Sequence, residues 1–381
     1  MNVALVYDRV NKWGGAERVL LALHRIWPDA PLYTAVYDPK RATWADVFSV
    51  RTSFLQHLPF ANRMHESLAM LTPMAFETFN FDAYDAVISI TSAEAKNIIT
   101  KPGTVHICYC LTPTRYLWSG YEQYRAQPGL GIISGVARIL LTWLGPLLRR
   151  WDLIASSRPD YYIAISNRVK DRIEGYYHRN VVDVIYPPVN EKKFTVHRSP
   201  FTENNTQGYF LTVSRLVSYK RVDILVRAFN TLGLPLVIIG DGRQKRELKH
   251  LAGKTITFID RHLTDSELVR YYGECRAFVF AADEDFGLVA AEAQAIGKPV
   301  IAYRQSGVSE IVKDNVTGVL FDDQTPEAVI RAVEAFGRKT FSSASCREQS
   351  ALMHEQQFAM RMKLLVDRLV TPAHAGREER T

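Results

Sequence analysis

The sequence predicts an α/β fold of two domains, each a mostly parallel sheet covered by helices. Two observations support this prediction. Short apolar runs typical of strands alternate with helical stretches in both halves of the chain, and a proline-containing step separates the two series. Alternating strands and helices imply parallel sheets, because each parallel strand is reached through a crossover helix. The 381 residues are enough for two domains of ordinary size.

The first series starts at the N-terminus. Val3–Val6 predicts a strand, and Ala16–Trp27, after a Gly–Gly turn, predicts a helix with one apolar face. Further strands are expected at Leu32–Val36, Ala86–Ile90, Val105–Tyr109, Tyr161–Ile165 and Val182–Ile185. The series ends at Tyr186–Val189, because Pro187 and Pro188 remove backbone donors and restrict their neighbours.

The second series begins after a polar stretch, Arg198–Gly208. Its strands are expected at Tyr209–Val213, Leu236–Ile239, Ile256–Ile259, Ala277–Phe280 and Pro299–Ala302. Met353–Val370 has helical spacing and is expected to cross back to the first domain, and the polar end, Arg377–Thr381, is expected to fray. We therefore predict two Rossmann-like domains facing a central cleft, with limits 1–187 and 188–352, and a returning helix and tail over 353–381.

Composition and charge narrow the function classes. Hydrophobic residues make up 47% of the chain and charged residues 23%, which is typical of a globular protein. The net charge of +7 is spread along the chain, so it suits an anionic small ligand or membrane surface and argues against nucleic acid. The four cysteines show neither metal-ligand nor disulfide spacing, and the N-terminus lacks the pattern of a signal peptide. These features predict a cytoplasmic protein.

One largely apolar segment, residues 129–151, indicates a contact with membranes. Arg138 interrupts the segment, Pro146 breaks it and Arg149–Arg150 close it, so it is too short for a confident span. A basic, tryptophan-bearing helix lying in the membrane interface would place the protein on the inner face of the cell membrane and in contact with anionic lipid. A buried helix of the first domain is the open alternative.

The segment Ala282–Ala293 carries two carboxylates, Glu284 and Glu292, around the step Phe286–Gly287. It predicts a strand tip at Glu284, a turn, and a helix with Glu292 about two turns inside it. A helix N-terminus beside a glycine favours phosphate, because its N–H groups and dipole point at the ligand. The flanking carboxylates suit the hydroxyls of a sugar or a ribose. Asp283–Asp285 also spells Asp-x-Asp, a pattern that can hold a divalent metal.

Two further motifs follow strands of the second series. Arg215 and Lys220 place two cations after the first strand, where arginine can bind a diphosphate in bidentate fashion and lysine acts as a point charge. Gly240–Asp241–Gly242 follows the next strand and permits close backbone approach to a ligand, although Lys245 replaces the third glycine of a dinucleotide fingerprint. Since ligands bind beyond the carboxyl ends of parallel strands, the three motifs predict one nucleotide-diphosphate site.

The first domain has its own glycine turn. Gly14 and Gly15 follow the first strand and open the first helix, so this turn can lie close to a phosphate or an acceptor hydroxyl. A plain strand–helix turn would use the same glycines.

These residues resemble the retaining glycosyltransferases of family 4, which have the GT-B fold. The resemblance rests on the motifs Arg215 with Lys220, Gly240–Gly242, and Glu284 through Phe286–Leu288 to Glu292. The first domain is similar to the mannosyltransferase branch that builds polysaccharides and O-antigen. That likeness is carried by Tyr7–Asp8, Gly14–Glu17, Cys108–Trp118 and Arg158–Tyr161.

The resemblance implies roles for individual residues. The second domain would hold a nucleotide-sugar donor, with Arg215 and Lys220 on the diphosphate, Glu292 on the ribose and Glu284 on the sugar. The implied catalytic set is Glu284, Arg215 and Lys220. The implied donor-binding set is Gly15, Gly240, Asp241, Phe286, Gly287, Leu288 and Glu292. The first domain would bind the acceptor, with Gly14 and Arg115 as candidates.

The branch also implies the substrates. It implies GDP-mannose, or a GDP-deoxyhexose derived from it, as donor and a lipid-linked saccharide as acceptor in polysaccharide or lipopolysaccharide assembly. No cofactor and no metal are expected, because Arg215, Lys220 and the amides of Gly287–Leu288 can offset the charge of the leaving diphosphate. No residue stands out as a covalent nucleophile, so we expect same-face attack. Metal dependence through Asp283–Asp285 and a UDP-sugar donor are the alternatives.

One residue departs from the pattern of the branch. Many members carry histidine where this chain has Leu111, and leucine can neither donate a hydrogen bond nor move a proton. Arg115 is the nearest polar residue that could serve, whereas His106 lies too far upstream to match. A nucleotide-sugar-binding subunit without turnover is therefore a further alternative.

Overall fold

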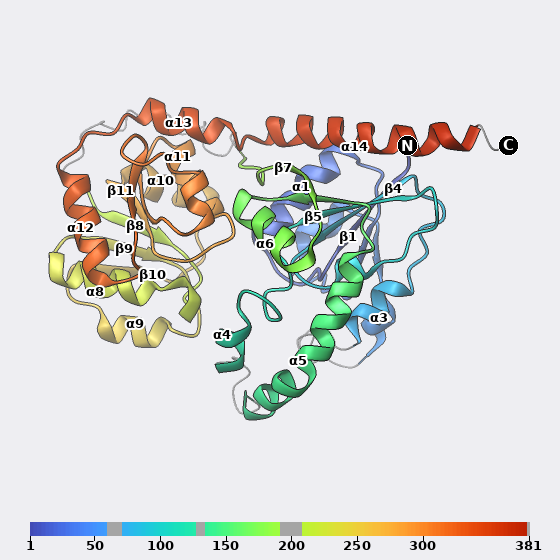
Figure 1. Ribbon diagram of the computed structural model, residues 1–381. Coiled ribbons are helices and arrows are strands. Elements are labelled where there is room, and N and C mark those ends of the chain that lie inside the picture. The colour runs from blue at the N-terminus through green and yellow to red at the C-terminus, as the bar shows by residue number, and fades with distance from the viewer. Residues whose placement is uncertain (59–70, 127–133, 191–207, 379–381) are drawn as a thin grey trace. The chain divides into compact units, whose positions relative to one another are not determined.

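The computed structural model describes residues 1–58, 71–126, 134–190 and 208–378, and the chain divides into two compact units (Figure 1). Unit 1 comprises Met1–Tyr186 with Phe358–Thr381, and unit 2 comprises Pro187–Gln357. The first limit is next to the one expected at 187, and residues 353–357 group with unit 2. Most of the expected polar stretch 198–208, the start of the segment 129–151 and the tail end 379–381 lie outside the described residues.

Unit 1 is built on a parallel sheet with the strand order β3-β2-β1-β4-β5-β6-β7. The strands are β1 (Val3–Tyr7), β2 (Leu32–Thr34), β3 (Val50–Thr52), β4 (Ala86–Thr91), β5 (Val105–Cys110), β6 (Tyr161–Ala164) and β7 (Val181–Val184). Strands β1, β4 and β5 are buried throughout, as expected of central strands covered on both faces. The expected strands are confirmed. Strand β3 was not predicted, because Val50–Arg51–Thr52 is too short and polar to stand out.

Helices cover this sheet. They are α1 (Gly15–Ile26), α3 (Thr72–Glu77), α4 (Tyr121–Ala126), α5 (Ser134–Ser156) and α6 (Asn167–Tyr177), with the short 3-10 turn η4 (Ala95–Asn97) after β4. Helix α1 buries Val19, Leu20 and Leu23, the apolar face expected from the sequence. The expectation that Pro146 breaks its segment is wrong, because α5 continues through this residue. A proline inside a helix removes one backbone hydrogen bond, and the flanking turns can still hold the helix.

Unit 2 repeats the arrangement with the strand order β10-β9-β8-β11-β12-β13, again parallel. The strands are β8 (Phe210–Val213), β9 (Leu236–Ile239), β10 (Ile256–Ile259), β11 (Ala277–Phe280), β12 (Val300–Tyr303) and β13 (Gly318–Phe321). The five expected strands are confirmed. Strand β13 was missed, because it opens on a glycine and has only four residues.

The helices of unit 2 alternate with these strands. They are α8 (Val222–Leu232), α9 (Lys245–Leu251), α10 (Asp265–Glu274), α11 (Leu288–Ala295), α12 (Pro326–Gly337) and α13 (Ser343–Ala351), with the 3-10 turns η6 (Ser218–Lys220) and η7 (Gly307–Glu310). Apolar side chains of α8 and α12, including Phe229 and Val333, share one core cluster with the strands. This burial holds the strand ends, and the loops that follow them, in fixed positions.

The last helix, α14 (Glu355–Glu378), belongs for most of its length to unit 1 (Figure 1). Phe358 packs edge-on against Tyr109 of β5, with ring centroids 5.9 Å apart. The Arg361 guanidinium lies 2.8 Å from the Asp183 carboxylate of β7. These two contacts dock the end of the chain on the first sheet.

Both sheets are doubly wound. The strand order reverses direction between β1 and β4 in unit 1 and between β8 and β11 in unit 2. Such a reversal separates the crossover connections and leaves a crevice at the carboxyl ends of the two strands, where ligands bind. The predicted α/β fold of two Rossmann-like parallel-sheet units is confirmed. The cleft expected between the units stays a prediction.

Candidate functional site

The reversal point of unit 2 brings together two of the predicted site residues. Lys220 lies in η6 after β8, and Glu284 lies in the turn after β11. The Lys220 Nζ donates a hydrogen bond to Glu284 Oε1 within an ion pair, and the two side chains are 14% and 19% exposed. A partly exposed charged pair at this edge of the sheet is available to a polar ligand. We call this pair and its flanking loops the β8–β11 site.

The backbone around Glu284 is anchored from the next strand. The Glu284 N–H donates to Ser306 Oγ at 3.1 Å, and the Gly307 N–H donates to the Glu284 carbonyl at 2.7 Å. A Cβ atom added at Gly307 would lie 2.3 Å from the Asp285 carbonyl oxygen, so this close approach requires glycine. The loop after β12 therefore fixes the acidic turn that carries Glu284.

Arg215 supplies the second cation of the same loop. Its guanidinium donates a hydrogen bond to the Tyr219 hydroxyl. The Lys220 Nζ lies 5.4 Å from the centroid of the Tyr219 ring and 5.8 Å from that of Phe280. Both cations of the predicted diphosphate-binding pair are thus held at the carboxyl end of β8.

The glycines of the motif after β9 have a structural task. Gly240 and Gly242 have φ angles of +148° and +158°, and an added Cβ would lie 1.9 Å from the Ser214 carbonyl oxygen and 2.3 Å from that of Leu216. The Leu216 N–H in turn donates to the Asp241 carbonyl at 2.9 Å. The close approach expected for a ligand is made here by the loop that carries Arg215. Contact of Gly240 and Asp241 with a donor stays a prediction.

The start of α11 offers backbone donors. Gly287, the N-cap residue, has a φ angle of +101° and, as a glycine, provides no side-chain cap. The first N–H groups of a helix have no partner inside it, so the amides from Leu288 onward suit an anion. Phe286, just before them, is buried.

The Glu292 side chain is buried in unit 2. Its side chain is 1% exposed, and its Oε2 accepts a hydrogen bond from the Tyr272 hydroxyl at 3.1 Å. The binding of a ribose by Glu292 stays a prediction.

Among the described residues, no three or more histidine, cysteine, aspartate or glutamate side chains form a group that could hold a metal ion. Asp283 and Asp285 flank Glu284 in the turn. That the reaction needs no metal stays a prediction.

The reversal point of unit 1 carries a second charged pair. Arg9 follows β1 and Glu94 follows β4, and the Arg9 guanidinium lies 2.9 Å from the Glu94 carboxylate. The Tyr116 hydroxyl donates to the same carboxylate at 2.9 Å. Burial raises the pKa of Glu94, and the neighbouring Arg9 opposes this rise. Arg9 and Glu94 were not predicted from the sequence, because each stands alone there and only the parallel pairing of β1 with β4 brings them together.

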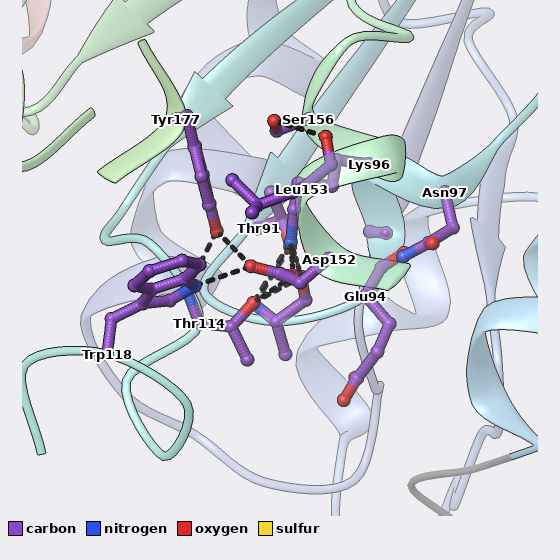
Figure 2. Close-up of polar contacts among 12 residues, drawn as sticks. Thr91, Glu94, Lys96, Asn97, Thr114, Trp118, Asp152, Leu153, Ser156 and Tyr177 are labelled. Atoms are coloured by element: carbon purple, nitrogen blue, oxygen red, sulfur yellow. Dashed lines mark hydrogen bonds and ion pairs between the residues drawn. The ribbon is translucent and has the colours of Figure 1, made fainter. Parts of the chain in front are cut away.

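A buried polar cluster lies next to this pair (Figure 2). Asp152 of α5 is 2.6 Å from the Lys96 Nζ of η4. Asp152 also accepts hydrogen bonds from Thr114 Oγ1 at 2.7 Å, from the Trp118 indole N–H at 2.7 Å and from the Tyr177 hydroxyl at 2.8 Å. We call these five residues the Lys96–Asp152 cluster.

The cluster fixes the segment 111–118, which carries Leu111 and Arg115. Burial alone would lower the pKa of Lys96, but the Asp152 carboxylate outweighs burial and the pKa is raised. Lys96 is therefore charged. The stretch Ala93–Ile98 mixes apolar residues with Glu94, Lys96 and Asn97, so the sequence by itself predicts no buried partner for the lysine.

The remaining expected residues lie on unit 1. Gly14 is extended (φ −176°) before α1, and Gly15 is the first residue of that helix. Leu111 directly follows β5, where its N–H donates to the Thr91 carbonyl at 2.8 Å, and Arg115 is half-buried. His106 lies at the other end of β5, 2.8 Å from Ser89 Oγ, and burial lowers its pKa to about 3. The roles of Gly14, Gly15 and Arg115 stay predictions.

Comparison with known families bears on the β8–β11 site. Residues 193–352 match the family model for glycosyl transferases group 1. We call residues 193–352 the group 1 segment. The group 1 segment contains Arg215, Lys220, Asp241, Glu284 and Glu292, so every titratable residue predicted to bind the donor lies within it.

Curated relatives match part of the chain. The chain is 27% identical over 218 residues to the O-antigen chain mannosyltransferase C of Escherichia coli, covering 54% of this chain and 57% of that one. It is 32% identical over 164 residues to a D-inositol 3-phosphate glycosyltransferase of Mycolicibacterium gilvum, covering 39% and 37%. An uncharacterized glycosyltransferase of Methanocaldococcus jannaschii is 30% identical over 177 residues, covering 45% and 48%. The chain thus spans about half or less of the length of these relatives.

Solved structures match the whole chain in fold. The sucrose-phosphate synthase of Thermosynechococcus elongatus superposes with a TM-score of 0.73 at 17% identity, covering 98% of this chain and 100% of that one. Anabaena Alr3699/HepE in complex with UDP and glucose gives 0.70 at 16% identity, covering 96% and 99%. The group 1 segment is therefore the second half of a GT-B fold, as the sequence predicted.

Proposed function

We propose that the protein is a retaining glycosyltransferase that moves a mannosyl residue, or a related residue of a GDP-deoxyhexose, from a GDP-sugar to a lipid-linked saccharide in cell-surface polysaccharide assembly. The observation that carries the proposal is the Lys220–Glu284 pair at the reversal point of unit 2, with Arg215 beside it. The group 1 segment supports the transferase class, and the Escherichia coli mannosyltransferase supports the sugar.

The proposed chemistry assigns each group a task. Arg215 and Lys220 bind the diphosphate and, with the first amides of α11, offset the negative charge that develops on it as the glycosidic C–O bond breaks. Glu284 orients the donor sugar through its hydroxyls. The acceptor hydroxyl attacks from the face that the diphosphate leaves, its oxygen bonds to the anomeric carbon, and its proton passes to a phosphate oxygen. No cofactor enters this step.

A panel of nucleotide sugars tests the donor. We expect GDP-mannose to raise the melting temperature of the full chain more than UDP-glucose or UDP-N-acetylglucosamine does, because a ligand that binds only the folded state stabilises it. A larger shift with a UDP-sugar would replace the GDP assignment. Tight GDP-mannose binding with no sugar transferred to lipid extract would favour a binding subunit without turnover, the alternative that Leu111 motivates. No shift with any nucleotide sugar would remove the proposal altogether.

Helix α5 supports the proposed contact with membranes. Trp143 and Leu147 are 80% and 55% exposed, and Ile154 and Arg150 are exposed as well. Positions 143, 147, 150 and 154 fall on one face of a helix, so apolar side chains and a cation share one stripe. Such a stripe suits the surface of an anionic membrane. None of the described helices is both long and apolar enough to cross a membrane.

Vesicle binding tests this stripe. We expect the chain to sediment with vesicles that contain anionic phospholipid, and Trp143→Ser/Leu147→Ser to reduce the bound fraction at least fivefold, because two large apolar groups no longer insert. Met360→Ser/Leu364→Ser is the matched control, since these residues are also exposed and four apart, on α14. Equal loss in both variants would contradict a specific role for α5.

A further inference from the structure

A cavity of about 440 Å³ in unit 1 lies on segments that leave two adjacent strands. One is helix α6, which follows β6, and the other is the segment after β5. Strands β5 and β6 are neighbours in the parallel sheet, so both segments emerge at its carboxyl edge, where ligands bind. The lining residues are Ser119, Arg168, Asp171, Arg172 and Tyr176. We call this cavity the α6 pocket.

The charges of the α6 pocket suit an anion. Arg168 and Arg172 are four residues apart on α6 and both line the cavity, so their guanidinium groups share one helix face. Arg168 lies in the first turn, where the helix dipole adds positive potential. Asp171 is the one carboxylate among the lining residues, and the two positive charges of Arg168 and Arg172 exceed its single negative charge. Guanidinium groups bind phosphate oxygens in bidentate fashion, which favours a phosphate or diphosphate ligand.

One wall of the pocket is fixed by buried charge. Tyr176 stacks on Trp118, with ring centroids 5.1 Å apart and planes at 20°. The Trp118 indole N–H is held by Asp152, as Figure 2 shows, and Asp152 is held by Lys96. Asp152 and Lys96 are 7% and 1% exposed. The aromatic wall is thus set before a ligand arrives, which lowers the entropic cost of binding.

The same wall continues toward the exposed stripe of α5. The Arg149 guanidinium lies 5.7 Å from the centroid of the Trp118 ring, and its Nε donates to the Leu117 carbonyl at 2.6 Å. Arg149 belongs to the helix that exposes Trp143 and Leu147. Helix α6, through Tyr176, and helix α5, through Arg149, therefore both contact Trp118 within unit 1.

We propose that the α6 pocket binds the diphosphate group of the lipid-linked acceptor through Arg168 and Arg172. This inference rests on the proposed function for the identity of the acceptor, whereas the binding of the anion does not depend on transfer. The pocket would anchor the acceptor by its diphosphate while the saccharide extends to the donor.

Titration calorimetry on the full chain tests the pocket. The background is Arg215→Gln/Lys220→Gln, which removes the cations that bind the donor diphosphate. The first probe is inorganic pyrophosphate in solution, and the second is a phosphatidylcholine vesicle that carries a polyprenyl diphosphate. We expect Arg168→Gln/Arg172→Gln to weaken both at least tenfold, because each arginine provides charge-assisted hydrogen bonds. We expect Asp171→Asn to tighten both, because it removes a like charge from beside the anion.

Lys170→Gln is the control for general electrostatics. Lys170 lies on the same helix outside the pocket lining, and this variant loses the same charge as one arginine variant does. Unchanged affinity in Lys170→Gln together with the expected arginine and aspartate effects supports the proposal. Three results would each overturn the site. They are no pyrophosphate binding in the Arg215→Gln/Lys220→Gln background, an affinity that Arg168→Gln/Arg172→Gln leaves unchanged, and an equal loss of affinity in Lys170→Gln. Pyrophosphate binding without binding of the lipid-carried diphosphate overturns the assignment to the acceptor.

The result is separable from the proposed function. Thermal shift with GDP-mannose, measured on the Arg168→Gln/Arg172→Gln variant of the otherwise native chain, should equal that of the native chain, because the donor residues are untouched. A native chain that binds pyrophosphate in the α6 pocket but no nucleotide sugar would remove the proposed function and leave the anion site.

Discussion

Glu284→Gln should lower sugar transfer by about a hundredfold to a thousandfold, since removal of one preorganised polar group at a reacting centre has an effect of that size. Glutamine keeps the shape of the side chain but loses the charge that pairs with Lys220. The donor sugar is then less well oriented, and Lys220 loses the ion pair that positions it. The measurement is the rate of GDP release from GDP-mannose in the presence of lipid extract, with Lys220→Ala assayed alongside.

Glu327→Gln is the matched control for this prediction. Glu327 is an exposed glutamate in the first turn of α12, and its variant should keep the native rate. Full activity in both Glu284→Gln and Lys220→Ala would show that the β8–β11 site is not the place of the reaction.

The second large effect concerns stability. Asp152→Asn should lower the free energy of unfolding by about 3–5 kcal/mol, because it leaves the charge of Lys96 buried without a compensating partner. It also weakens the hydrogen bonds from Thr114, Trp118 and Tyr177. Urea unfolding followed by circular dichroism measures the change.

Two variants show whether the ion pair is the cause. Asp29→Asn removes an exposed carboxylate and should change stability by less than about 0.5 kcal/mol. Lys96→Met/Asp152→Asn removes both charges and should recover part of the loss, since an apolar replacement of a buried pair is tolerated better than a lone charge. A loss under about 1 kcal/mol in Asp152→Asn would mean that the Lys96–Asp152 cluster contributes little to folding.

Much of the fold could be predicted, because its strands are apolar runs with clear ends. Val3–Tyr7 and Ala277–Phe280 are buried on both faces, and such strands stand out in sequence. Strands β3 and β13 could not be found, because three or four residues with a polar or glycine member carry no periodic signal. The helix break predicted at Pro146 is wrong, since the neighbouring turns keep α5 helical through this residue.

The candidate site residues also include some that the sequence predicts and some that it does not. Lys220 and Glu284 lie in the segments that follow β8 and β11, so the parallel topology was enough to predict that they come together. The pairs Arg9–Glu94 and Lys96–Asp152 join residues 85 and 56 positions apart, and their members carry no motif. Only the register of β1 with β4 and the docking of α5 bring these partners together. The glycines of the motif after β9 were recognised as sites of close approach, but the neighbouring backbone makes that approach.

The proposed function requires the β8–β11 site to bind the diphosphate of a GDP-sugar through its cations, and titration of GDP into the full chain measures this binding. We predict one GDP per native chain, affinity at least tenfold weaker in Lys220→Gln, and unchanged affinity in Lys254→Gln, which removes an exposed lysine of the same unit. Equal affinity in the native chain and in Lys220→Gln would show that Lys220 does not bind the diphosphate.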